Sequence, residues 1–214
     1  MTGVRPAARE SLPVSAEAVR SNLERVRSEV GPDVTLVVAT KYVTVDELDA
    51  LAEGGVEVVG ENRAQDLAAK HERYGDRFRW HFIGHLQSRK AKDVSAVCEL
   101  CHSLASESAA RRLTIPALVE VNLAGEDSKS GMTPDELGPF LARARELGVE
   151  VRGLMTMPPL ADDPERSRPY FRELRKLAGE HELPELSMGT SQDYRVAAEE
   201  GATLVRVGSV LFDR

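Results

Sequence analysis

A lysine ends a strand-like apolar run early in the sequence. Residues 34–40 are mostly β-branched or small, and Lys41 follows them directly. Side chains alternate across a strand, so Lys41 shares a face with Thr35, Val37 and Ala39. If this strand belongs to a closed barrel, Lys41 points into the mouth at the carboxyl end, where desolvation disfavours its charged form and makes the amine a usable nucleophile. The alternative is a surface lysine at a strand end, hydrogen-bonded and chemically inert.

Two segments late in the sequence could hold an anion. Gly189-Thr190-Ser191 and Gly208-Ser209 follow the last two predicted strands. Glycine lets a backbone approach a ligand closely, and the amides at a following helix start favour an anion. Barrel proteins frequently bind phosphate at this place. Each segment alone could be a tight turn, but both segments together with the strand-end lysine favour a phosphate site.

Arg206 lies on the last predicted strand, two residues before Gly208. Its parity is opposite to that of Val205 and Val207, so it faces the barrel interior if the valines face the helices. A lysine opposite a phosphate site predicts a phosphorylated carbonyl compound held as an imine, either pyridoxal phosphate or a phosphosugar in an aldolase-like enzyme. Arginine stays protonated, so it could donate to a pyridine nitrogen and keep that nitrogen unprotonated. Arg206 therefore favours pyridoxal phosphate in part, and an ion pair with a loop carboxylate is its alternative role.

A scaffold must bring these residues to one end of the molecule. A helical pattern over residues 15–30, with Ser15 as N-cap, is followed by eight strand-like segments that each precede a helix or helix-like turn. The alternation predicts an α/β protein with a single TIM-like (β/α)8 barrel at residues 15–214, an extra N-terminal helix, and a flexible tail at residues 1–14. We expect the extra helix to cover the gap beside the last strand. An open doubly wound sheet is the main alternative, but no G-x-G-x-x-G follows the first strand. The strands are expected at residues 34–41, 56–59, 78–83, 95–102, 117–123, 149–154, 185–188 and 203–207.

The composition argues against several classes of protein. A net charge of −7 and a pI near 5.4 argue against nucleic acid or an anionic membrane surface as partner. No apolar run approaches the roughly 20 residues that span a bilayer, and residues 1–13 lack the apolar region of a secretory signal. We therefore expect a cytoplasmic protein. Cys98 and Cys101 have no second pair to complete a zinc site, so we expect reduced structural cysteines and no metal.

Seven segments carry a family resemblance, in order and at barrel intervals, through nearly the whole sequence after the first helix. They are VVATKYVTVDEL (37–48), GENRAQDL (60–67), WHFIGHLQSRK (80–90), EVNLAGEDSKSGM (120–132), GLMTMPP (153–159), LSMGTSQDY (186–194) and VRVGSVLF (205–212). Together they resemble the pyridoxal phosphate homeostasis protein family. The family's fold is similar to the barrel domain of alanine racemase and of bacterial-type ornithine decarboxylases, so the resemblance implies that barrel.

The resemblance also implies which residues hold the cofactor. Pyridoxal 5'-phosphate would be bound as a Schiff base on Lys41, with Arg206 at the pyridine nitrogen. The other implied cofactor-binding positions are Asn62, Met188, Ser191, Gly208 and Ser209, the last three on the phosphate.

Members of this family are thought to store or hand over the reactive aldehyde, and they have no settled enzymatic activity. The resemblance therefore implies a carrier in intracellular pyridoxal phosphate homeostasis, with apo forms of pyridoxal-phosphate-dependent enzymes as partners. We expect a monomer that binds neither nucleic acid nor a membrane. The alternative is an amino-acid racemase or lyase with weak activity that acts through the same imine. The residues on the same rim that could donate a proton are Tyr42, His85 and Lys129.

Three positions depart from the family pattern. Arg89 stands where asparagine is common, Thr190 where methionine is common, and Ser209 where threonine is common. Ser209 keeps the hydroxyl, so phosphate binding is expected to persist, whereas Arg89 and Thr190 add polar groups that bear on partner contacts. Residues 103–116 also form a shorter segment than usual, which predicts a smaller outer helix.

Overall fold

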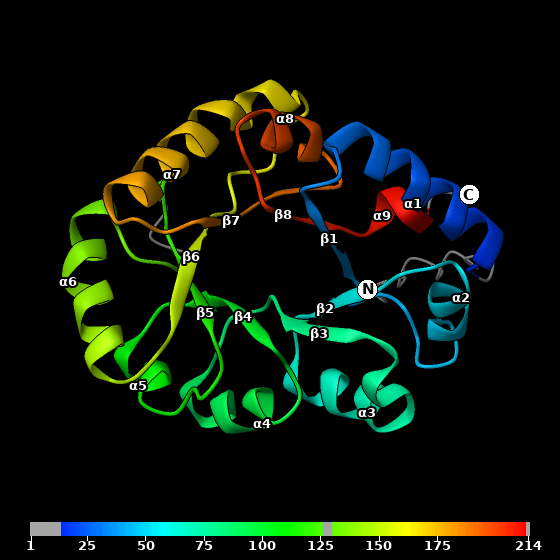
Figure 1. Ribbon diagram of the computed structural model, residues 1–214, viewed down its shortest axis with the longest axis horizontal. Coiled ribbons are helices and arrows are strands. Elements are labelled where there is room, and N and C mark those ends of the chain that lie inside the picture. Colours follow the sequence, from blue (N-terminus) through cyan, green and yellow to red (C-terminus); the bar gives the residue numbers. More distant parts are fainter. Residues whose placement is uncertain (1–13, 126–129, 213–214) are drawn as a thin grey trace, which may run out of the picture.

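Eight parallel strands close into a barrel in the order of the chain (Figure 1). The computed structural model describes residues 14–125 and 130–212. β1 pairs with β2 on one side and with β8 on the other. This closure confirms the predicted barrel and is incompatible with an open doubly wound sheet. The strands are β1 (Thr35–Ala39), β2 (Val58–Glu61), β3 (Arg79–Phe82), β4 (Leu100–Leu104), β5 (Ala117–Glu120), β6 (Val151–Met155), β7 (Glu185–Thr190) and β8 (Leu204–Val207).

Helices connect successive strands and cover the outside of the barrel (Figure 1). The start of α6 shows how local sequence sets their positions. The amide and hydroxyl of Thr133 both donate to the Glu136 carboxylate, and Pro134 occupies the first helical position. The helices are α1 (Ala16–Val30), α2 (Leu48–Glu53), α3 (Ala64–Tyr74), α4 (Ala91–Ser95), α5 (Glu107–Ala110), α6 (Pro134–Glu146), α7 (Arg168–Glu180), α8 (Tyr194–Glu199) and α9 (Ser209–Phe212), with short 3-10 turns η1 (Gly75–Arg77), η2 (Ser88–Lys90) and η3 (Pro164–Ser167).

The extra helix, α1, covers the gap beside the last strand. The Ser15 hydroxyl caps it by accepting a hydrogen bond from the amide of Ala18 at 3.2 Å. Its buried face consists of Val19, Leu23 and Val26, and it packs against α2, α8 and α9. Because α9 has only four residues, α1 supplies most of the helical cover between β8 and β1, as predicted.

Alternation along the strands divides the apolar core into two layers. On β1, Val37 faces the lumen and Val38 faces the helices; on β8, Leu204 faces the lumen and Val205 faces the helices. This alternation confirms that Arg206 has lumen parity. The apolar residues buried in the lumen are Val37, Val58, Leu100, Leu118, Met155 and Leu204.

All eight strands differ from their predicted ranges by at least one residue at one end, and two of these differences matter most. β1 ends at Ala39, so Lys41 lies on the following turn and not on the strand. The fourth strand was expected at residues 95–102, but β4 begins only at Leu100. The segment before it is the end of α4, which stops at Ser95, and the turn after that helix, where the amide of Cys98 bonds to the carbonyl of Val94 at 2.8 Å. In the short segment 103–116, α5 has four residues, which agrees with the small outer helix predicted there.

Cys98 and Cys101 are buried free thiols. Burial raises the pKa of both, that of Cys101 to about 11, so both are protonated at neutral pH. Within residues 14–125 and 130–212, no group of His, Cys, Asp and Glu could hold a metal ion. No helix in the same ranges is long and apolar enough to span a bilayer. Most of the predicted tail, residues 1–13, lies outside the described residues, and Val14 packs half-buried against the outer core.

Candidate functional site

Lys41 lies at the carboxyl end of the barrel, on the turn between β1 and α2. Its side chain is exposed, and Nζ lies 4.8 Å from the centroid of the Tyr42 ring, which is itself 86% exposed. The prediction that the Lys41 amine is desolvated is therefore wrong for the protein without a ligand. Its side chain contacts solvent and the face of the Tyr42 ring. A ligand that covers the mouth would have to supply that desolvation.

A buried ion pair anchors the backbone just before Lys41. Lys70 of α3 and Glu61 of β2 form this pair, with side chains 6% and 0% exposed. Lys70 Nζ also donates to the Thr40 carbonyl at 2.7 Å, and the Thr40 hydroxyl donates to the Glu61 carboxylate. Glu61 Oε2 has no hydrogen-bond partner among the described residues. Separating such a pair would leave an uncompensated buried charge, so Thr40 and the start of the Lys41 turn are held in place.

Amide groups at the carboxyl end of β8 converge on one oxygen. Ser191 Oγ accepts hydrogen bonds from the amide of Gly208 at 2.9 Å and from that of Val210 at 3.4 Å. A phosphate oxygen could take the same donors, because neighbouring amides that point into one concavity bind anions. The hydroxyl-bearing Ser209 lies between these two amides in the sequence and is exposed. The structure thus brings Ser191 to Gly208 and Ser209.

This end of β8 touches the strand that leads to Lys41. β8 pairs with β1 through Val207 and Val38, and a Cβ added to Gly208 would lie 3.3 Å from the Ala39 carbonyl oxygen. Glycine therefore permits the close approach of the two backbones. The amine and the converging amides lie after neighbouring strands, at the same end of the barrel.

Arg206 lies inside the lumen on β8 and is 7% exposed. Nη1 donates to the Ser187 hydroxyl at 2.8 Å and to its carbonyl at 3.3 Å, and Nη2 donates to the Thr156 carbonyl at 2.9 Å. Burial lowers the pKa of Arg206 to about 10, opposed by the charges of Glu120 and Asp193, so it is a cation at neutral pH. A guanidinium has five N–H groups, so two remain without a partner in the described part of the chain. Arg206 also forms no ion pair there, which disfavours the alternative role.

Two further predicted positions differ in how they face the mouth. Asn62 follows β2 and is half-buried, and an added Cβ on Gly84 would lie 2.1 Å from its carbonyl oxygen. The loops after β2 and β3 are therefore in backbone contact. Met188 is fully buried on the outer face of β7, in the core between strands and helices. Its side chain points away from the mouth, so only the backbone of Met188 could contact a ligand bound there.

The candidate proton donors divide into two groups. Tyr42 and His85 are exposed on the loops after β1 and β3. Lys129 lies outside the described residues. Neither exposed side chain is held over Lys41 by a buried partner, although Tyr42 contacts the Lys41 ammonium.

Two of the departures from the family pattern have local hydrogen-bond partners. The amide and hydroxyl of Thr190 donate to Asp193 Oδ1 at 2.7 and 3.0 Å, so this threonine is bound to the residue that directly precedes α8. Arg89 is exposed, and its Nε donates to the Gln87 side chain at 3.0 Å. Thr190 therefore shapes the loop after β7 without directing its hydroxyl freely at the mouth.

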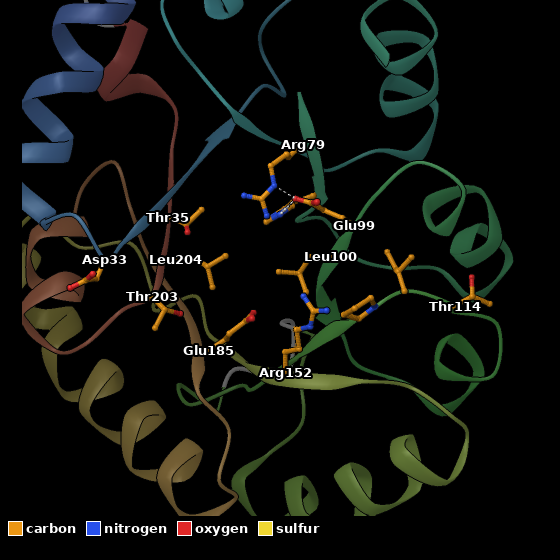
Figure 2. Close-up of a pocket in the computed structure, with 13 residues that line it drawn as sticks. Asp33, Thr35, Arg79, Glu99, Leu100, Thr114, Arg152, Glu185, Thr203 and Leu204 are labelled. Atoms are coloured by element: carbon orange, nitrogen blue, oxygen red, sulfur yellow. Dashed lines mark hydrogen bonds and ion pairs between the residues drawn. The ribbon is translucent and has the colours of Figure 1, made fainter. Parts of the chain in front are cut away.

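A cavity of about 540 Å³ opens at the opposite, amino-terminal end of the barrel (Figure 2). Residues from strand starts and the segments before them line it, among them Arg79, Glu99, Arg152 and Glu185. Arg79 Nε and the Glu99 carboxylate form an ion pair at 2.6 Å, drawn in Figure 2. Barrel proteins carry their chemistry at the carboxyl ends of the strands. The convergent amides, the amine and the lumen arginine are all at that other end, so this cavity is not the candidate cofactor site.

Several buried polar residues were not identified from the sequence. His81 and His102 have lumen parity on β3 and β4, so alternation along the strands was a usable signal for them, as it was for Ser187 on β7. Glu61 ends β2 in a buried position, but nothing in the sequence marks Lys70 of α3 as its partner. Such a pair between a strand and a helix is visible only in the folded chain.

The mouth fits pyridoxal phosphate by the chemistry of its donors. An amine suits the aldehyde, convergent amides with hydroxyls suit the phosphate, and a buried cation with open N–H groups suits a ring nitrogen. These groups come from Lys41, Gly208 with its neighbours, and Arg206, which lie on or just after two paired strands. A phosphosugar would leave the buried guanidinium without a matching acceptor ring.

Comparison with known proteins agrees with this geometry. Residues 14–213 match the family model described as alanine racemase, N-terminal domain. The pyridoxal phosphate homeostasis protein of Aquifex aeolicus is 41% identical over 194 residues, covering 83% of this chain and 85% of its own. That of Deinococcus radiodurans is 38% identical over 212 residues, covering 93% of this chain and 100% of its own.

A solved structure is similar over nearly the same length. PipY of Synechococcus elongatus PCC7942, solved with pyridoxal phosphate bound, is 31% identical with a TM-score of 0.83, and the match covers 91% of this chain and 99% of PipY. The family resemblance seen in the sequence is confirmed. This chain belongs to the pyridoxal phosphate homeostasis protein family, on the barrel of the alanine racemase N-terminal domain.

Proposed function

We propose that this protein binds pyridoxal 5'-phosphate as a Schiff base on Lys41, and that it stores the cofactor or hands it over in pyridoxal phosphate homeostasis. The observation that carries the proposal is the contact between the ends of β1 and β8, where Gly208 packs on Ala39. This contact brings the converging amides of Gly208 and Val210 next to β1, the strand that leads to Lys41. The likeness to PipY, which was solved with this cofactor, supports the same ligand.

Each group at the mouth has a distinct task. Lys41 Nζ bonds to the aldehyde carbon with loss of water, the amide of Gly208 and the hydroxyls of Ser191 and Ser209 bind the phosphate, and Arg206 donates to the ring nitrogen. The bound cofactor supplies an electron-withdrawing ring. Because Arg206 is cationic at neutral pH, it keeps the ring nitrogen unprotonated and weakens that withdrawal.

The openness of the mouth favours a carrier over a dedicated enzyme. Lys41 and Tyr42 are exposed, so water and free amines can reach the amine. Such access assists release of the cofactor and works against controlled carbanion chemistry. Asn62 and the backbone of Met188 would border the ligand. The protein would act as a monomer and pass the cofactor to apo forms of pyridoxal-phosphate-dependent enzymes.

Borohydride trapping tests the proposal directly. The purified protein is mixed with pyridoxal phosphate, reduced, digested and mapped by mass spectrometry. We expect the reduced adduct on Lys41, and its loss in Lys41→Ala. Lys92→Ala, an exposed lysine on α4, is the matched control and should keep the Lys41 adduct. Absence of an adduct on Lys41 would leave a phosphate-binding barrel with an inert lysine.

A second measurement separates the carrier from the weak racemase or lyase. The loaded protein is incubated with amino acids and, separately, with an apo-enzyme that needs the cofactor. A carrier activates the apo-enzyme without turning over the amino acids. Saturable turnover that Lys41→Ala abolishes would assign an enzyme instead, with Tyr42 and His85 as the first proton donors to replace.

A further inference from the structure

A chain of buried polar side chains runs through the lumen, from Arg206 to the cavity at the amino-terminal end. Ser187 of β7, His102 of β4 and His81 of β3 form its middle, and each is at most 2% exposed. Arg206 Nη1 lies 2.8 Å from Ser187 Oγ, which lies 2.8 Å from His102 Nδ1. His102 Nε2 lies 2.9 Å from His81 Nδ1, and His81 Nε2 lies 3.2 Å from the Glu99 carboxylate. Glu99 lines the cavity shown in Figure 2.

The chemistry of the two ends gives every hydrogen bond in this chain one direction. Arg206 can only donate and the Glu99 carboxylate can only accept, so Ser187 Oγ accepts from Arg206 and directs its own hydrogen at His102 Nδ1. His102 therefore carries its proton on Nε2 and donates to His81 Nδ1. His81 in turn carries its proton on Nε2 and donates to the Glu99 carboxylate. This assignment requires both imidazoles to be neutral, and burial lowers the pKa of each, that of His81 to about 4.

We propose that Ser187 and His102 are positioning residues that hold the Arg206 guanidinium where it meets the cofactor ring, with His81 and Glu99 fixing them from the other end of the barrel. This inference rests on the proposed function, because that function places Arg206 at the ring nitrogen. None of these four residues touches the mouth itself, so they act through Arg206.

The geometry shows why Arg206 depends on this chain. Its guanidinium has three hydrogen bonds in the described residues, two to Ser187 and one to the Thr156 carbonyl. Ser187 Oγ is the only one of these acceptors that is itself oriented by a side chain. Without that hydroxyl, the Arg206 side chain would keep only backbone carbonyls as acceptors. Less free energy would then be needed to rotate the guanidinium out of its position. Hydrogen bonds linked in series also strengthen one another in a low-dielectric interior.

The test is a double-mutant cycle on cofactor affinity. The dissociation constant for pyridoxal phosphate is measured by titration for the wild type, Ser187→Ala, Arg206→Gln and the double variant. We expect Ser187→Ala to weaken binding about tenfold, the size of one charge-assisted hydrogen bond. If Ser187 acts through Arg206, its replacement should add nothing once Arg206 is glutamine. Ser167→Ala, a buried serine in the helical layer, should keep wild-type affinity.

Two results would overturn the inference. One is wild-type affinity in Ser187→Ala. The other is the same loss with and without Arg206, which would assign Ser187 a general packing role. His102→Leu tests the next residue of the hydrogen-bonded series and should also weaken binding while circular dichroism shows a folded barrel. If that variant binds like the wild type, His102 is not a positioning residue and the series that holds Arg206 ends at Ser187. If the variant does not fold, the double-mutant cycle on Ser187 and Arg206 remains the test of the inference.

A readout without cofactor separates this inference from the proposed function. Nitrogen-15 NMR of the free protein should show His81 and His102 as neutral imidazoles with the proton on Nε2, and Ser187→Ala should move the Nδ1 signal of His102. A proton on Nδ1 of either ring would refute the direction of the chain. Failure of Lys41 to form an adduct would refute the proposed function and leave these signals unchanged.

Discussion

The lumen histidines should make the folded protein sensitive to mild acid. Burial lowers the pKa of His81 to about 4 from its usual 6.5, opposed by the nearby Glu99. Below pH 6.5 the unfolded chain takes up a proton at His81 that the folded chain excludes until the pH approaches 4. The unfolded state binds more protons across this window, so the free energy of unfolding falls as the pH falls. The contribution of neutral His81 to the free energy of unfolding is complete only above the unfolded pKa of 6.5.

The size of the effect follows from that pKa difference. Each unit of pH below the unfolded pKa costs about 1.4 kcal/mol, so His81 alone should remove about 2 kcal/mol between pH 7 and pH 5. The pKa of His102 is lowered in the same direction, so it adds to the loss. Hydrogen bonds from Arg168 lower the pKa of the Glu165 and Glu200 carboxylates, so both keep their charge to lower pH in the folded protein than in the unfolded chain.

The assay is urea unfolding at pH 7 and pH 5 for the wild type and His81→Gln. The variant should lose about 2 kcal/mol less than the wild type between the two pH values. His181→Gln, at the end of α7 and away from the lumen, is the matched control and should keep the wild-type loss. An equal loss in the wild type and His81→Gln would show that His81 is protonated in the folded barrel, which would also break the directional chain to Glu99.

Three other perturbations follow from buried contacts. Lys70→Met should lower the free energy of unfolding by about 3–5 kcal/mol because it leaves the Glu61 carboxylate buried without its cation; Glu61→Leu added to it should recover part of the loss in urea unfolding, and a neutral single variant would contradict the pair. Gly84→Ala should cost about 2 kcal/mol or more, since its Cβ would overlap the Asn62 carbonyl; an unchanged melting temperature would mean that the two loops separate easily. The two buried thiols should not react with Ellman's reagent at pH 8 in the native protein but should react in urea, and fast native labelling would show that they are accessible.

The barrel was predictable because its signals are local. Apolar segments bounded by glycine recur with helices between them, and alternation alone placed Arg206 in the lumen. The failures are local too. β1 ends before Lys41 because the chain turns after Ala39, and residue types do not encode that turn. The run before β4 was expected to be a strand, because an apolar segment of this length fits a strand and a helix end equally well.

The site was predictable only in part. The loops after β1, β7 and β8 carry the lysine, hydroxyls and glycines that their sequence positions indicated. The exposure of Lys41 was not predictable, since it depends on how far the surrounding loops rise above the mouth. The contact between His102 and Ser187 joins β4 and β7, which do not pair with each other, over 85 residues of sequence. No periodicity reports such a pair, although lumen parity could have marked each member.

The pairing of β1 with β8 determines when the barrel can close during synthesis of the chain. Leu36 pairs with Val205, so β1 must wait for nearly the whole polypeptide to emerge from the ribosome before its second neighbour exists. During translation its free edge stays uncovered, as does the part of α1 that packs against α8 and α9, which is a state prone to aggregation. Nascent chains of this protein should therefore depend on chaperones that shield unfinished folds until β8 arrives.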